Sequence, residues 1–408
     1  MIEEGILNNG IQVIHQQNTY SKVGHIGVFI NVGSRDEEKG EEGLAHYLEH
    51  VIFKGTKKRK AFHVLSRLDS VGGELNAYTT KEETCVYASF PIEYLSRALE
   101  LLSDIIFNSN FPNQELQKEK EVVVEEINSY KDSPTDLIFD EFDKQLFKGH
   151  SLGNDILGTE LQVKSIKRSD VLNFVKKYYI PERMVISSIG SYPLKKLINY
   201  LEKYFEIKST KIESQKRSLP KLVFPKDKIV KRDVHQTHTM IGGRGYSADH
   251  PSKNSLLLLN NLLGGPAMNS RLNLSIREKY GFTYMLESNC TIYSDCGSFS
   301  VYFASDPKNT FRVEKLIQKE FLKLCNQSLG TIQLSQAKKQ VKGQLVISME
   351  NNLGVMLANG KSKLLFDKVD NLDKVLSEFE KITSTELLEV ANEIMHPKKL
   401  FKLTFQSK

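Results

Sequence analysis

An internal repeat constrains the fold of this chain more than any other feature of its sequence. The first half carries, in order, a strand, an apolar helix, a second helix and a pair of strands. The strand is VFINVG (28–33), the apolar helix is GLAHYLEHVIF (43–53), and the pair of strands is ELNAYTTKEETCVYASF (74–90). The same order returns about 215 residues later in TMIGGRG (239–245), SLLLLNNLLGG (255–265) and TYMLESNCTIYSDCGSFSVYFAS (283–305). Strand alternation mixed with helical spacing predicts α+β layers. We therefore predict two homologous, duplicated α/β-layer domains.

The boundary between the two copies is predicted from a change in composition. Between residues 207 and 227 the apolar periodicity gives way to charged residues, serine and two prolines, which is typical of a linker. The chain has 408 residues, 40% of them hydrophobic, and this length suits two domains better than one. The predicted domains are residues 1–207 and 224–408.

Charge and cysteine content narrow the class of protein. The 56 basic and 50 acidic residues are interspersed, so the net charge of +6 forms no basic block and gives no reason to expect nucleic acid as a partner. The four cysteines match neither a zinc ribbon nor a dense disulfide framework and are expected to be reduced. The N-terminal residues lack the order of a secretion signal, and no apolar run is long enough to span a membrane. We expect a cytoplasmic protein with no membrane partner.

Two histidines and a glutamate stand close together in the first apolar helix. On a helix, His46 and His50 lie about 40° apart and Glu49 lies about 60° to the other side of His46, so all three share one face. Two neutral imidazoles can hold zinc, and a third protein ligand plus water completes a catalytic site. Zinc lowers the pKa of its water to about 7, so hydroxide forms near neutrality and can attack a carbonyl, with Glu49 accepting the proton.

The same three residues can also occur by chance. Taken alone, the spacing leaves a metal site and a chance arrangement about equally probable. A chance arrangement is energetically unfavourable, because this helix is expected to be largely buried and burial of an unpaired imidazole or charge costs free energy.

A third ligand is available in the helix NQELQKEKEVVVEEINSY that follows Pro112. Glu119 and Glu126 are seven residues apart and so point to nearly the same side, whereas Glu125 is displaced by about 100°. We predict Glu126 as the third ligand of one zinc ion per chain and Glu119 as a carboxylate behind the ligands that orients the site. The alternative is a solvated acidic face.

These residues resemble the pitrilysin/insulinase family of inverted zincins, in its processing-peptidase-like group. The pattern is His-x-x-Glu-His followed 76 residues later by the Glu of VVVEEI, and the segments GSRDEEKGEEGLAHYLEHVIFKGT, GGELNAYTTKEETCVYASF and GHSLGNDILGT extend the likeness. The resemblance covers essentially the whole chain. It implies a zinc metalloendopeptidase with two domains of the LuxS/processing-peptidase-like type.

The resemblance also implies substrate-binding residues in both halves. GGPAMNSRLNLSIREKYGFTY is similar to the family stretch with an Arg and a Tyr seven apart, here Arg277 and Tyr284, which bind the carbonyl of the cleaved bond. Without the family, Arg277 reads as a surface charge. Asn76 and Ala77 match the family's substrate-binding strand, to which an unfolded peptide could add as an extra strand. An ordinary hairpin strand is the equal alternative.

The functional prediction is cleavage of unfolded peptides inside a dimeric, clamshell-shaped chamber. The metal-binding residues and the pair Arg277 and Tyr284 occur in one chain. The resemblance therefore favours a homodimer in which Arg277 and Tyr284 act at the zinc site of the partner chain. A catalytic subunit of a heterodimer and a non-catalytic structural or assembly homologue are the alternatives. The intact His46, Glu49, His50 and Glu126 argue against the second of these.

Overall fold

The computed structural model describes residues 2–207 and 217–407, which form two compact units. Unit 1 comprises Met1–Ser129, Asn154–Arg217 and Ser348–Val369, and unit 2 comprises Tyr130–Gly153, Ser218–Ile347 and Asp370–Lys408. Within the predicted linker, residues 208–216 lie outside the described residues. Each unit thus contains a segment from the other half of the sequence. The predicted domain bounds, residues 1–207 and 224–408, stay a prediction.

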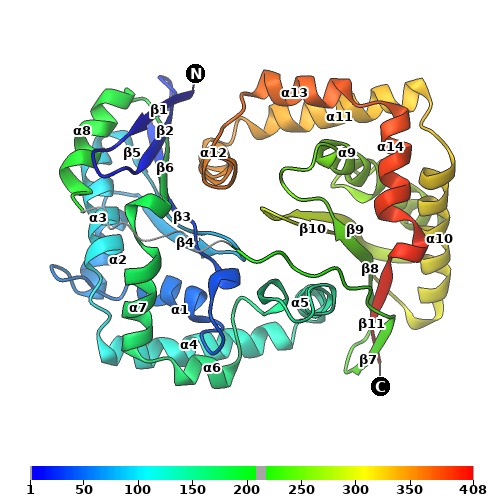
Figure 1. Ribbon diagram of the computed structural model, residues 1–408, viewed down its shortest axis with the longest axis horizontal. Helices are drawn as coiled ribbons and strands as arrows, with labels where there is room; N and C mark the ends of the chain where they lie inside the picture. The colour runs from blue at the N-terminus through cyan, green and yellow to red at the C-terminus, as the bar shows by residue number, and fades with distance from the viewer. Residues whose placement is uncertain (1, 208–216, 408) are drawn as a thin grey trace. The chain divides into compact units, whose positions relative to one another are not determined.

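Unit 1 is built on a six-stranded sheet in the order β1-β2-β6-β3-β5-β4 (Figure 1). The strands are β1 (Ile2–Ile6), β2 (Gln12–Gln17), β3 (Val23–Ile30), β4 (Glu74–Thr79), β5 (Thr84–Pro91) and β6 (Met184–Gly190). All neighbours are antiparallel except β2 and β6, which are parallel. The sheet therefore ends at β4, whose outer edge pairs with no described strand.

Helices cover both faces of this sheet. One face packs on the larger apolar core, with helices α1 (Leu44–Val51), α2 (Ala61–Asp69), α3 (Leu95–Asn108), α4 (Asn113–Lys131), α6 (Glu160–Ser165), α7 (Arg168–Tyr178) and α8 (Leu194–Tyr204). The other face is covered by α12 (Asn352–Phe366), which contributes Val355 and Met356 to a small core around Phe29. Gly360 allows this approach, because a Cβ at that position would lie 2.1 Å from the Phe29 ring. The strand β3 alternates between the two cores, as a strand buried on both faces must.

Unit 2 repeats this design around a five-stranded sheet in the order β7-β11-β8-β10-β9. The strands are β7 (Lys228–Arg232), β8 (Thr237–Gly245), β9 (Thr283–Ile292), β10 (Gly297–Ser305) and β11 (Phe401–Ser407). One face packs on α9 (Lys253–Gly264), α10 (Pro307–Asn326), α11 (Thr331–Ser348), α13 (Leu372–Lys381), α14 (Ser384–Val390) and two π-helical turns, Asn273–Glu278 and Ala391–Met395. The other face is covered by α5 (Pro134–Leu146), which packs on β8 and β11.

The two units exchange their single covering helices. Helix α5 belongs to the first half of the sequence and lies on the sheet of unit 2, whereas α12 belongs to the second half and lies on the sheet of unit 1. The pairs α1 and α9, α4 and α11, and α5 and α12 each begin about 210–220 residues apart. The predicted two-domain α+β fold is confirmed.

Among the described residues, none of the helices has the length and apolar content needed to cross a bilayer. A cytoplasmic location and the clamshell dimer stay predictions.

Candidate metal centre

Helix α1 presents two histidines on one face of unit 1. Its apolar residues Leu44, Leu48 and Val51 are fully buried in the core, and this burial fixes the helix against the sheet and sets the direction of the opposite face. His46 is 8% exposed and His50 is half-buried, with their ring centroids 4.7 Å apart.

The start of α1 is held by a carboxylate that the sequence analysis did not single out. Glu37 accepts hydrogen bonds from the backbone N–H of Gly43 at 3.1 Å and of Ala45 at 2.8 Å, and so satisfies amides at the helix N-terminus. Gly43 has φ of +90°, and a Cβ there would lie 2.6 Å from the Leu157 carbonyl oxygen. Burial raises the pKa of Glu37 well above its usual value, an effect that these two amides oppose. An acidic residue a few positions before an apolar helix was the available sequence signal.

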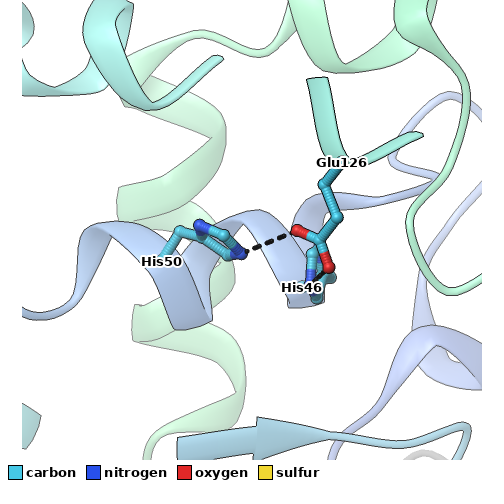
Figure 2. A group of neighbouring side chains, drawn as sticks. All are labelled: His46, His50 and Glu126. Carbon is cyan, nitrogen blue, oxygen red and sulfur yellow. Dashed lines mark ion pairs between the residues drawn. The ribbon is translucent and has the colours of Figure 1, made fainter. Parts of the chain in front are cut away.

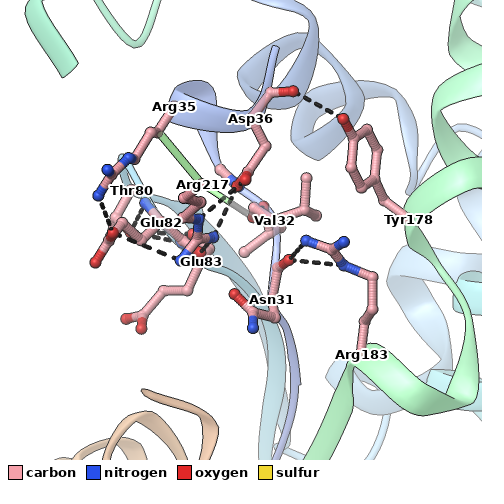
Figure 3. A network of polar contacts seen from close by, with 12 residues as sticks. Asn31, Val32, Arg35, Asp36, Thr80, Glu82, Glu83, Tyr178, Arg183 and Arg217 are labelled. Atoms are coloured by element: carbon pink, nitrogen blue, oxygen red, sulfur yellow. Dashed lines mark hydrogen bonds and ion pairs between the residues drawn. The ribbon is translucent and has the colours of Figure 1, made fainter. Parts of the chain in front are cut away.

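The loop before α1 is fixed by a buried network of ion pairs (Figure 3). Arg35 Nη1 lies 2.6 Å from Glu82 Oε1, and both side chains are about 95% buried or more. Arg217 donates to both carboxylate oxygens of Asp36, at 2.9 and 2.7 Å, and to the backbone oxygen of Glu82. This network joins the helical turn Ser34–Asp36 to the hairpin between β4 and β5.

Helix α4 brings Glu126 to the two histidines (Figure 2). Glu126 Oε2 lies 3.2 Å from His50 Nε2, and Glu126 Oε1 lies 3.7 Å from His46 Nε2. The ligand atoms of these three residues all lie within 4.8 Å of one another. Helix α4 is tied to α1 by the Tyr47 hydroxyl, which donates to the Leu116 carbonyl at 2.6 Å.

This arrangement fits a zinc ion. Burial, together with the neighbouring His50, lowers the pKa of His46 to about 4, so its imidazole is neutral at pH 7. A neutral ring and a carboxylate oxygen 3.7 Å apart form neither a hydrogen bond nor an ion pair. Donor atoms bound to one zinc at about 2.0–2.1 Å in a tetrahedron lie about 3.4 Å from each other, close to the separations seen here. Two nitrogens and one carboxylate oxygen are also the donor set of a catalytic zinc site.

Glu119 lies behind the three candidate ligands. Its Oε2 is 3.4 Å from His50 Nδ1, and its Oε1 is 2.7 Å from Lys54 Nζ. A carboxylate facing Nδ1 favours the tautomer that carries its proton there, which leaves the Nε2 lone pair directed toward Glu126. Glu119 is 7% exposed, is matched in charge by Lys54 and lies outside the group of three candidate metal ligands, and its orienting role stays a prediction.

Glu49 is half-buried on the same helix and stands beside the end of β4. Burial raises the pKa of Glu49, an effect opposed by Thr79 of β4 and by His50. Asn76 and Ala77 lie in the middle of β4, where they pair with Tyr87 and Val86 of β5 on one side only. The helix α1 therefore runs against the edge strand to which the sequence analysis assigned peptide binding.

Arg277 and Tyr284 are brought together within unit 2. The Arg277 guanidinium carbon lies 4.4 Å from the centroid of the Tyr284 ring, in cation–π geometry. Arg277 sits in the π-helical turn Asn273–Glu278, and Tyr284 is in the edge strand β9 with 78% of its surface exposed. The two side chains thus form one polar patch in unit 2, whereas the histidine pair and Glu126 belong to unit 1.

Comparison with known proteins identifies the family. Residues 12–160 match the family model Insulinase (Peptidase family M16), and residues 165–341 match the model Peptidase M16 inactive domain. The uncharacterized zinc protease YmxG of Bacillus subtilis is 34% identical over 395 residues, covering 97% of this chain and 96% of that protein. The chain belongs to the insulinase family, peptidase family M16. The predicted family resemblance is confirmed.

Further M16 relatives agree over nearly full length. The uncharacterized zinc protease ML0855 of Mycobacterium leprae is 30% identical and covers 96% of this chain and 88% of its own length. The crystal structure of a protease from Helicobacter pylori has the same fold, with a TM-score of 0.91 at 23% identity and coverage of 100% and 99%. Relatives of this M16 chain are thus named as zinc proteases, and the half that matches the inactive-domain model lacks the histidine pair.

Proposed function

We propose that this M16 chain is a zinc-dependent endopeptidase that cleaves peptide bonds in unfolded peptides. The observation that carries the proposal is the convergence of His46 and His50 from α1 with Glu126 from α4, next to a half-buried Glu49. His46, His50 and Glu126 would hold one zinc ion per chain. When bound, zinc supplies Lewis acidity, which polarises a carbonyl and acidifies a water molecule.

Glu49 would serve as the general base and then as the proton donor. A carboxylate with a raised pKa is a better proton acceptor than an exposed one, and it gives the proton up more readily to a leaving amine than a stronger base would. The half-buried position of Glu49 beside β4 suits this role, because a peptide added to that strand would run past the carboxylate.

The edge of β4 would bind the substrate as an additional strand. Main-chain hydrogen bonds near Asn76 and Ala77 would hold an extended peptide with little demand on its side chains. A folded protein has few free extended segments to offer, which is why unfolded peptides are the proposed substrates.

Arg277 and Tyr284 would bind the carbonyl oxygen of the cleaved bond. A guanidinium and a phenol both donate hydrogen bonds, and both stabilise the negative charge that develops on this oxygen during attack. The contact between the two side chains fixes the guanidinium over the Tyr284 ring before substrate arrives. We assign them to the partner's zinc in a homodimer, with a heterodimer as the alternative.

Zinc analysis combined with peptide cleavage tests this proposal. The purified chain should contain about one zinc per chain and cleave an unstructured quenched peptide. Glu49→Gln should remove cleavage and retain zinc, while Glu125→Gln, an exposed position on α4, should leave both unchanged. A well-folded chain that binds no zinc and cleaves no peptide would instead favour a non-catalytic structural or assembly homologue.

A further inference from the structure

Unit 2 contains two adjoining cavities on its helical side that share Arg271, Leu274 and Gln333. Their volumes are about 550 and 470 Å³, within the usual range for ligand sites. The walls come from the segment Asn269–Ser275 and from helices α10 and α11. All of these residues belong to unit 2.

The cavity walls carry side-chain amides around the Arg271 guanidinium, and the wall of the second cavity also holds the ion pair between Glu320 and Lys323. The amide residues of the two cavities are Asn269, Gln333, Gln336, Gln340 and Gln327. An amide offers both a donor and an acceptor, so this lining suits a ligand with peptide-like groups. The first cavity has Arg271 as its single ionisable residue.

Arg271 lies on the walls of both cavities. Its side chain is half-buried, and burial lowers the pKa of its guanidinium, an effect that Glu320 opposes. Within the part of the chain that the structure describes, Arg271 makes neither an ion pair nor a hydrogen bond. Glu320, the carboxylate that opposes the pKa shift, forms an ion pair with Lys323 at 2.6 Å. Ser275, on the wall of the second cavity, also has a buried hydroxyl oxygen with no hydrogen-bond partner among the described residues.

Three arginines of unit 1 are paired with carboxylates, whereas the half-buried Arg183 and Arg244 donate to backbone carbonyl oxygens. Arg35 pairs with Glu82 and Arg217 with Asp36 (Figure 3), and Arg59 contacts both Glu100 and Asp104. A guanidinium carries five donors in a planar fork that matches a carboxylate in two parallel hydrogen bonds. Arg271 therefore lacks the partner that these other sites supply from within the chain.

We propose that this cavity pair is a carboxylate-binding site, in which Arg271 receives the C-terminal carboxylate of a short peptide and the amide side chains bind its peptide groups. A free small dicarboxylate offers the same carboxylate chemistry without the peptide groups. The site is distinct from the histidine pair and Glu126, which belong to unit 1, and it does not depend on the proposed peptidase activity.

The site lies against the π-helical turn that carries Arg277. Leu274 and Ser275 line the cavities and belong to that turn, Asn273–Glu278. π-Helical turns are rare and occur frequently at functional sites. A ligand that packs on Leu274 and Ser275 should stabilise this turn. Binding is therefore expected to slow amide hydrogen exchange within residues 273–278.

Calorimetric titration of the full chain tests the proposal. The probes are an acetylated trialanine with a free carboxylate, the same peptide with a C-terminal amide, and succinate. The free-acid peptide should bind, and the amidated peptide should bind at least about tenfold more weakly, because it loses the charge-assisted hydrogen bonds. Arg271→Gln should weaken binding of the free acid by a similar factor, and Arg271→Lys by less. Arg312→Gln, an exposed position on α10, is the matched control and should leave binding unchanged.

Each outcome of the titration bears on the proposal. Binding of the free acid without binding of succinate identifies a peptide terminus as the ligand, and binding of both, sensitive to Arg271→Gln, identifies a general carboxylate site. Absence of binding by either acid overturns the proposal. So does equal binding of acid and amide, or binding that Arg271→Gln leaves intact while thermal unfolding shows a folded variant.

Discussion

Glu126 Oε2 lies 3.2 Å from His50 Nε2, although the two residues come from different helices and are separated by a hairpin and two further helices in the sequence. Since His46 is neutral at pH 7, the proposed zinc ion would be the charge that holds the carboxylate against both rings. This relationship is the centre of the proposed metal site.

Glu126→Gln is expected to remove most zinc affinity. The amide carries no charge and is a poor zinc ligand, so the dissociation constant for zinc should rise at least about a hundredfold. This rise is larger than that expected when a residue that only orients a ligand is replaced. Competition with a chromophoric chelator measures this constant. Glu125→Gln on the exposed side of the same helix is the control, and equal losses for both variants would contradict the assignment of Glu126 as a ligand.

Glu119→Gln is expected to have a smaller effect on the same measurement. The variant keeps the shape of the side chain but removes the charge that faces His50 Nδ1 and Lys54 Nζ. Zinc affinity should fall about 10- to 100-fold, as for other carboxylates that orient a histidine ligand. Glu121→Gln, exposed on the same helix, should change nothing. An unchanged zinc affinity in Glu119→Gln would remove its orienting role.

Glu37→Ala should destabilise unit 1 by leaving two N-terminal amides of α1 without an acceptor. Loss of two hydrogen bonds to a buried carboxyl group is expected to cost about 2–4 kcal/mol. Glu37→Gln retains one acceptor oxygen and should cost less. Urea unfolding of the zinc-free protein measures both values. If Glu37→Ala unfolds like the wild type, the carboxylate does not hold the helix start.

The stability of the zinc-free protein should fall with acidification, in part through His15. This ring is fully buried and contacts the Tyr192 carbonyl at 2.7 Å, and burial lowers its pKa despite the opposing charge of Glu3. The unfolded chain takes up the proton near pH 6.5 and the folded chain only at lower pH. The contribution of His15 to the free energy of unfolding is therefore fully present above about pH 6.5 and is lost as the pH falls below that value.

Unfolding free energies at pH 7.5, 6.5 and 5.5 measure this effect. His15→Gln, which can still donate to the Tyr192 carbonyl, should show a shallower decline than the wild type. His63→Gln, at an exposed position, should follow the wild type. Parallel declines in His15→Gln and the wild type would assign the pH dependence to other groups.

Arg277→Ala should lower turnover of a peptide substrate about a hundredfold or more and leave zinc content unchanged, since it removes a donor to the developing oxyanion and no zinc ligand. Mixing this variant with Glu49→Gln should restore part of the activity if each site combines residues of two chains. No recovery, with sedimentation showing a single chain, would contradict the homodimer.

Features that depend on local spacing could be predicted from the amino-acid sequence. The α+β class follows from alternation and helical periodicity, and the shared face of His46, Glu49 and His50 follows from 3.6 residues per turn. The seven-residue spacing likewise predicted that Glu119 and Glu126 face one side of α4 and that Glu125 faces another, because this arrangement depends on one helix alone.

The contacts between elements that are distant in the sequence depend on the three-dimensional packing of the chain. The exchange of α5 and α12 between the two units has no local signal, because the spacing of apolar residues along a helix does not say which sheet the helix will cover. Packing also decided that Glu37 accepts hydrogen bonds from the amides at the start of α1, and that Arg271 has no ion-pair partner among the described residues. The roles of Glu37 and Arg271 depend on which groups are buried around them and which partners lie within reach, and packing decides both.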